Sequence, residues 1–167
     1  LSTFKLFQDT GNVFWGAMAK GTISKVDIST GEGRIIEIPP GKSNTEDIIK
    51  DKNKNLWLAF LGDGVCRYDP DKGTTKFYTT KNGLSNNTTY NLLEDRSGNI
   101  WVSTDNGISM INPATDQIRT FGLSDGLKIH EFNSGAKFRT EEGEFLFGGM
   151  GGFVRFYPDS LLSYDKS

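Results

Sequence analysis

The strongest constraint on how this chain can fold is a sequence repeat of about 44 residues. A column of large apolar residues recurs at separations of 43, 44 and 45, and a column of glycines recurs at separations of 43, 43 and 45. The first column is Phe14, Trp57, Trp101 and Leu146, and the second is Gly21, Gly64, Gly107 and Gly152. Because two independent columns agree on one period, the chain consists of four similar units.

Each unit has the pattern of short strands. Apolar residues recur at every second position, as in Ile100 and Val102, and no stretch sustains a helical period. Turn sequences such as Asp105-Asn106-Gly107 separate these runs. In the third unit we predict strands at about 89–95, 99–104, 107–112 and 117–121. Four antiparallel strands in about 40–45 residues are typical of one blade of a β-propeller.

We therefore predict an all-β fold, a β-propeller fragment of four four-stranded antiparallel blades. The blades are expected at about 1–40, 45–80, 88–122 and 131–162, within a single segment that spans residues 1–167. A short connection into Gly107 requires a positive φ, which glycine adopts without steric cost. Trp57 and Trp101 would fill the space between blades and bury about 150–250 Å² each. Stacking on a sugar is the alternative role for these tryptophans.

Composition argues against several functions. The chain has 19 basic and 21 acidic residues and a net charge of −2, so we expect no nucleic-acid partner. It has no apolar run of about 18 residues, so we expect no membrane insertion by this segment. Cys66 is the single cysteine, which excludes an intrachain disulfide. The sequence that starts at Asp51 resembles half of a calcium loop, but Gly62 stands where a ligating Glu is needed. We expect neither a metal nor a cofactor.

Residues 83–108, GLSNNTTYNLLEDRSGNIWVSTDNGI, resemble the two-component regulator propeller repeats of the periplasmic sensor regions of hybrid two-component systems. The last unit, with Asp125-Gly126-Leu127 and the glycine run at 148–152, is similar to the final blade of the second propeller in such sensors. The resemblance implies the periplasmic portion of an inner-membrane receptor, with a histidine kinase elsewhere in the parent protein. Family propellers have more than four blades, so we expect a fragment of a larger receptor.

The resemblance also implies a function. It implies a non-catalytic sensor module that detects glycan-derived oligosaccharides and regulates the transcription of genes for polysaccharide utilisation. A propeller scaffold that mediates only receptor dimerisation is one alternative. A propeller-type lyase or glycosidase is another, but it needs paired carboxylates or a histidine-centred set, and the chain has only His130. We assign no catalytic residue.

A ligand of a propeller is expected at the mouth of the central channel, where the loops between blades and between second and third strands converge. The candidate binding residues in these loops are Asp63, Asn86, Asn87, Asp105, Asn106, Ser124 and Asp125. Asn and Asp offer hydrogen-bonding atoms to sugar hydroxyls. They are equally common as turn formers, so both interpretations stay open.

The number of blades predicts an assembly. An open arc leaves one apolar sheet face bare at each end, and such faces are normally covered by a partner. Two copies arranged head to tail would together reach the upper end of the range of about 4–8 blades known for propellers. We therefore expect a homodimer that completes a ring.

Overall fold

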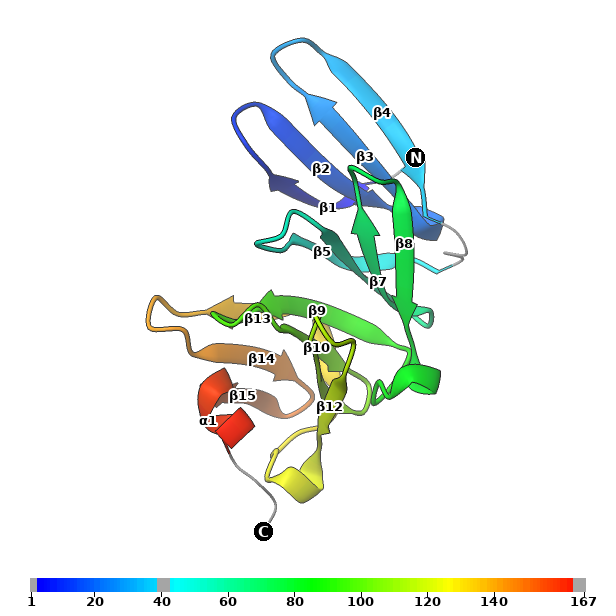
Figure 1. Ribbon diagram of the computed structural model, residues 1–167. Coiled ribbons are helices and arrows are strands. Elements are labelled where there is room, and N and C mark those ends of the chain that lie inside the picture. The colour runs from blue at the N-terminus through cyan, green and yellow to red at the C-terminus, as the bar shows by residue number, and fades with distance from the viewer. Residues whose placement is uncertain (1–2, 39–42, 164–167) are drawn as a thin grey trace.

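The computed structural model describes residues 3–38 and 43–163, which form four antiparallel sheets that follow one another along an arc (Figure 1). The first sheet contains β1 (Thr3–Gln8), β2 (Val13–Met18), β3 (Thr22–Asp27) and β4 (Glu32–Glu37). The second contains β5 (Thr45–Lys50), β6 (Leu56–Phe60), β7 (Gly64–Asp69) and β8 (Thr74–Tyr78). The third contains β9 (Thr89–Glu94), β10 (Ile100–Thr104), β11 (Gly107–Ile111) and β12 (Ile118–Phe121). The predicted all-β propeller fold is confirmed.

The fourth sheet has three strands within the described residues, where a four-stranded sheet was predicted. These are β13 (Phe132–Arg139), β14 (Phe145–Gly149) and β15 (Gly152–Phe156), and the helix α1 (Pro158–Ser163) follows them. Proline has no backbone N–H to donate to a strand ladder and is favourable at the first position of a helix. Leu161 and Leu162 of α1 pack against the apolar cluster between the third and fourth sheets.

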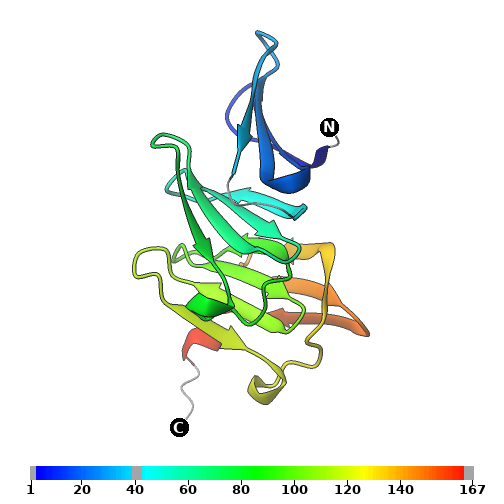
Figure 2. The same ribbon diagram turned by 90° about the vertical axis from the view of Figure 1, so that its right-hand side faces the viewer.

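The first strand of every sheet lies at the inner side of the arc. Within each sheet the strands lie in the order of the chain, all antiparallel. Neighbouring sheets meet mainly through β1, β5, β9 and β13, and β13 contacts both β9 and β5. Figure 2 shows the sheets stacked along the molecule, with the first sheet at one end. This radial arrangement of sheets brings side chains of different repeats together along one axis.

An apolar cluster fills each of the three interfaces between sheets, and a tryptophan occupies a repeated place in it. Trp15, Trp57 and Trp101 are buried in the first, second and third cluster respectively. Each indole Nε1 donates a hydrogen bond to the Asp six residues earlier: to Asp9 at 3.0 Å, Asp51 at 2.7 Å and Asp95 at 2.8 Å. The tryptophans thus fill the space between sheets, and their polar atoms are satisfied at the turn that precedes the strand.

The register corrects one position of the predicted apolar column. Trp15 pairs with Phe7 and Lys25, just as Trp57 pairs with Ile49 and Arg67, so Trp15 and not Phe14 belongs to the column. Phe14 points to the opposite face of the first sheet, because successive residues of a strand alternate between faces. The reason for the error is that the separation between the first two units is 42 residues at this column, one fewer than the glycines indicated.

Gly64 and Gly107 are required by the turns between the second and third strands. Their φ values are +78° and +88°. A Cβ built on either residue would collide with the backbone carbonyl oxygen of the last residue of the fourth strand. These oxygens belong to Tyr78 and Phe121. The glycine column therefore reflects both a left-handed backbone and a close approach between strands.

Candidate functional site at the inner side of the arc

The predicted binding residues lie on the connections that the propeller geometry indicated. Asp63 is between β6 and β7, and Asp105 and Asn106 are between β10 and β11. Asn86 and Asn87 precede β9, and Ser124 and Asp125 belong to the 3-10 helix η3 (Leu123–Asp125) before β13. Backbone contacts join the first connections: the N–H groups of Gly62 and Gly64 both donate to the carbonyl of Asn87. Among the described residues, no backbone hydrogen bond joins Ser124 or Asp125 to the connections that carry Asp63 and Asn87.

Three of these seven side chains stabilise the connections in which they lie. Asn86 Oδ1 accepts a hydrogen bond from the N–H of Thr88, and Asn87 Oδ1 accepts one from Thr80, both at 2.8 Å. Asp125 Oδ2 accepts the N–H of Gly122 at 2.9 Å. These three side chains therefore act as turn formers, which is one of the two roles expected for Asn and Asp in these loops.

The two remaining acids reach further. Asp63 Oδ2 accepts hydrogen bonds from the N–H and the hydroxyl of Ser43, at 2.9 and 2.5 Å. The hydroxyl of Tyr90 donates to Asp105 Oδ1 at 2.6 Å, and burial together with this bond raises the pKa of Tyr90 to about 12. A ligand-binding role for the seven loop residues stays a prediction.

A second polar set, which the sequence reasoning missed, lies on the first strands. Lys5, Asp47 and Asn91 occupy the same place in the first three sheets: they pair with Ala17, Ala59 and Ser103, each two residues after the tryptophan of the second strand. Lys137 of the fourth sheet pairs with Phe147, one residue after Leu146, so it lies on the other face of its sheet, toward Asp47. We call these four residues the axial column. The sequence contains a signal for three of them, because each follows a threonine by two residues, in Thr3-Phe4-Lys5, Thr45-Glu46-Asp47 and Thr89-Tyr90-Asn91.

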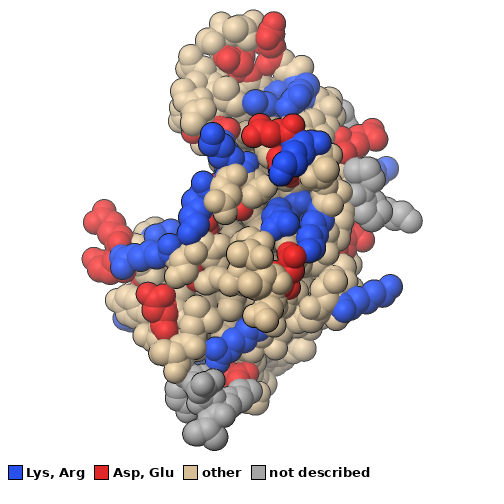
Figure 3. All heavy atoms as spheres, in the orientation of Figure 1, with Lys and Arg blue, Asp and Glu red and all other residues tan. Residues whose placement is uncertain are grey.

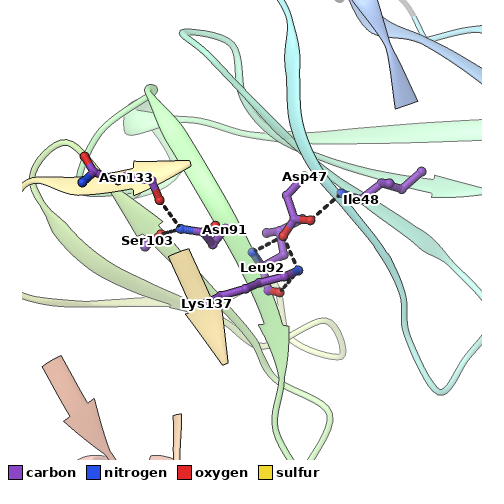
Figure 4. A network of polar contacts seen from close by, with 7 residues as sticks. All are labelled: Asp47, Ile48, Asn91, Leu92, Ser103, Asn133 and Lys137. Carbon is purple, nitrogen blue, oxygen red and sulfur yellow. Dashed lines mark hydrogen bonds and ion pairs between the residues drawn. The ribbon is translucent and has the colours of Figure 1, made fainter. Parts of the chain in front are cut away.

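Asp47 is the centre of a network that joins three sheets (Figure 4). Its carboxylate accepts hydrogen bonds from the N–H of Leu92 at 2.7 Å and from the N–H of Ile48 at 3.0 Å. It also accepts one from Lys137 Nζ at 2.5 Å, and the same ammonium donates to the carbonyl of Leu92 at 3.0 Å. Asp47 is only 5% exposed. A buried carboxylate needs such partners, so the pair ties the second sheet to the fourth across the inner side of the arc.

Asn91 joins the third sheet to the fourth. Its amide nitrogen donates to Ser103 Oγ at 2.9 Å and to the carbonyl of Asn133 at 2.8 Å (Figure 4). Its Oδ1 is buried and accepts no hydrogen bond from the described residues. An unpaired buried acceptor costs free energy, and such groups require an explanation.

A cavity of about 630 Å³ lies beside the axial column. Its walls come from the first strands of the first, second and fourth sheets and from the residues just after them. The polar lining consists of Lys5, Gln8, Asp9, Asp47, Lys50, Asp51 and Lys137. In Figure 3 the surface is indented between the first sheet and the body below it, and basic side chains gather on both sides of this indentation.

Each acid of the cavity is held by donors of the protein. Burial raises the pKa of Asp9, but hydrogen bonds from Lys50 and Trp15 outweigh it and hold this pKa below its usual value. The Lys50 ammonium lies 2.5 Å from Asp9. Asp51 accepts bonds from the backbone and side chain of Asn55 and from Trp57. Asp51 thus organises a strand-joining turn. No group of three or more potential metal ligands occurs among the described residues.

The fold and the repeats define the class of this protein: it is a segment of a β-propeller. Residues 83–106 match the model of the two component regulator propeller family. A curated relative, histidine kinase P4 from Formosa agariphila, is 34% identical over 80 residues, which are 48% of this chain and 6% of that protein. These matches confirm the resemblance seen in the sequence.

Solved structures agree with this assignment. The extracellular domain of the hybrid two component system BT3049 from B. thetaiotaomicron superposes with a TM-score of 0.80 at 26% identity, over 95% of this chain and 22% of that domain. The extracellular domain of BT4673 from the same organism has a TM-score of 0.73 at 24% identity, over 92% of this chain and 22% of that one. This chain is therefore similar to extracellular sensor regions, and it spans less than a quarter of their length.

Virginiamycin B lyase from Staphylococcus aureus has a TM-score of 0.68 at 18% identity, over 93% of this chain and 56% of the lyase. At this identity the likeness shows the fold alone.

Within the part of the chain that the structure describes, no helix has the length and hydropathy needed to cross a bilayer.

Proposed function

We propose that this chain is a non-catalytic part of the periplasmic sensor region of a hybrid two-component system. In this proposal the sensor binds glycan-derived oligosaccharides and, through a histidine kinase of the parent protein at the inner membrane, regulates genes for polysaccharide utilisation. The observation that carries the proposal is the similarity to the BT3049 extracellular domain over 95% of this chain. The chain is a small part of its relatives, so the activity of the parent belongs to the proposal.

The cavity beside the axial column suits a sensor because its walls belong to three sheets. A ligand that contacts β1, β5 and β13 together would bind best to one arrangement of these sheets. It would then shift the population toward that arrangement by its difference in affinity, and the attached kinase would respond to the shift.

Calorimetry and thermal unfolding with a panel of oligosaccharides test the proposal. A ligand that binds the native state raises its stability, so at least one oligosaccharide is expected to raise the melting temperature and to bind saturably. Product analysis of the same mixtures should show every sugar unchanged. Absence of binding across the panel would refute oligosaccharide sensing, and cleavage of a sugar would identify a lyase or glycosidase instead.

A scaffold function has an observation in its favour. The outer face of the first sheet exposes Leu6 at 69% and Ile35 at 58%, and the outer face of the last sheet exposes Phe138 at 63% and Phe153 at 61%. We propose that two copies associate head to tail through these faces and complete a ring. Light scattering should then show a dimer whose population rises with concentration, whereas a monodisperse monomer throughout would rule out this assembly.

A further inference from the structure

The cavity beside the axial column has an excess of unused hydrogen-bond donors on cations. An ammonium group carries three N–H donors. Lys137 uses two of them, on Asp47 and on the carbonyl of Leu92, and Lys50 uses one, on Asp9. The Lys5 ammonium makes neither a hydrogen bond nor an ion pair with any of the described residues. The three lysines come from three different sheets and line one cavity.

The acids of the same cavity have no comparable spare capacity. Asp47 accepts three hydrogen bonds and is 5% exposed. Asp51 is equally buried and accepts bonds from Asn53, Asn55 and Trp57. Asp9 accepts bonds from Trp15 and Lys50. Although lysines and aspartates are equal in number, the groups still available to a ligand are N–H donors with positive charge.

Backbone geometry provides room for one of these donors. Gly135 has a φ of +73°, and a Cβ built on it would lie 3.3 Å from Lys5 Nζ. The ammonium of the first sheet therefore reaches the innermost strand of the fourth sheet, close to Lys137 in the same strand. A side chain at position 135 would crowd this place.

We propose that Lys5, Lys50 and Lys137 bind an acidic group, a carboxylate or a sulfate, of an oligosaccharide in this cavity. The proposal rests on the proposed function, because the sugar part of the ligand comes from it. It specifies the class of glycan, namely one that carries uronic acid or sulfate. Charge-assisted hydrogen bonds from an ammonium to an oxyanion are short and strong, and three of them would bridge the first, second and fourth sheets.

Tetragalacturonate and its fully methyl-esterified form test this proposal, because they share one backbone and differ in charge. Sodium sulfate serves as an anion without a sugar. The amides of Lys5, Lys50, Gly135 and Lys137 are followed by ¹H–¹⁵N NMR in the 167-residue chain. We expect saturable shifts with tetragalacturonate that weaken as salt is raised, and much weaker binding of the ester.

Lys5→Met is the diagnostic variant, and Lys81→Met, at an exposed position of the 3-10 helix η2 (Thr80–Asn82), is its control. Lys5→Met should weaken tetragalacturonate binding by about tenfold or more, since it removes a charged donor. It should leave the melting temperature unchanged, because the Lys5 ammonium has no hydrogen-bond or ion-pair partner among the described residues. Lys81→Met should change neither quantity.

The outcomes separate this proposal from the proposed function. Equal binding of the acid and its ester would overturn the acidic-group site and leave oligosaccharide sensing intact. Sulfate binding that depends on Lys5, with no stronger binding of tetragalacturonate, would support the anion site and count against a glycan ligand. Failure of both anions to shift the four amides would overturn the site.

Discussion

The first and third sheets have the same strand order and different degrees of burial. Every residue of β10 and β11 in the third sheet is buried, whereas in the matching strands β2 and β3 of the first sheet only Trp15, Gly16, Ala17, Met18 and Ile23 are buried. The third sheet has a neighbour on each face and the first sheet has one neighbour. A propeller blade thus owes its core to the sheets beside it, and an end sheet of equal regularity is left half solvated.

The interfaces between sheets have two unlike sides. One side carries the tryptophan column and packs against aliphatic residues of the next sheet, as Trp57 and Ala59 pack with Leu92, Ile100 and Val102. The exposed face of the first sheet corresponds to the aliphatic side of an interface and carries Leu6 and Ile35. The exposed face of the last sheet corresponds to the side that carries the tryptophans in the other sheets, and Leu146 stands at the tryptophan position there. The end faces are therefore complementary to each other and not each to itself, which favours head-to-tail packing.

The largest difference between the two sheets is expected from substitutions of glycine. Gly107→Val in the third sheet places a β-branched residue at φ +88° and forces it against the carbonyl of Phe121. Strain and overpacking together should cost about 3–5 kcal/mol in the free energy of unfolding. Gly31→Ala, in the turn of the first sheet at φ +74° with open space around its Cβ position, should cost about 1–2 kcal/mol. Denaturant titration measures both, and similar losses would contradict the account of the glycine column.

The next largest effect concerns the network that ties the second sheet to the fourth. Asp47→Ala leaves Lys137 without its carboxylate and the N–H of Leu92 without its acceptor. We expect a loss of about 3 kcal/mol, because one partner of a largely buried pair is removed. Adding Lys137→Met should cost clearly less in the Asp47→Ala background than in the native chain. Additive losses in this double-mutant cycle would mean that the two residues do not act together.

Much of the fold could be predicted from the sequence, because a strand repeat with turn glycines leaves few architectures. The strands of the third unit lie within one residue of their predicted ends, since Trp101, Gly107 and the Asp95–Asn99 turn are all regular there. The first unit was misaligned at Phe14 because Trp15 and Phe14 are both aromatic, and only the register or the bond from Trp15 to Asp9 separates them. Within the described residues the last sheet has no fourth strand because Pro158 begins the helix α1, whereas the other units continue into a fourth strand.

The candidate site was less predictable. Loop position indicated Asn86, Asn87 and Asp125, but the sequence does not show that turns use these side chains. The axial column depends on register irregularities in the first strands, which place Lys5 and Asp47 at equivalent positions although their charges are opposite. Contacts such as Lys137 with Asp47 join residues two units apart, and the repeat predicts only which units are neighbours.

A smaller effect is expected from Asp9, the carboxylate of the first sheet that holds Trp15. Its pKa in the folded chain lies below the ordinary 3.8, because the bonds from Lys50 and Trp15 outweigh the opposing effect of burial. The stability that ionised Asp9 contributes is therefore present above about pH 4 and is lost as the pH falls through the lowered pKa. Asp9→Asn should lower the melting temperature at about pH 7, and the difference from the native chain should shrink toward about pH 3. A difference that stays constant with pH would refute this role.

The smallest effect is expected at the exposed end face. Leu6→Ser removes an apolar side chain that is 69% exposed, so the unfolding free energy of a dilute monomer should change by no more than about 0.5 kcal/mol. Leu58→Ser, at the equivalent face of the second sheet and fully buried, should cost about 3 kcal/mol or more. Raising the protein concentration sharpens the comparison: if a second copy covers the first sheet, Leu6→Ser reduces the concentration-dependent gain in melting temperature, since association stabilises the folded chain by mass action. An identical concentration dependence in the native chain and in Leu6→Ser would mean that this face takes no part in assembly, and the half-solvated first sheet would then be stable with one neighbour alone.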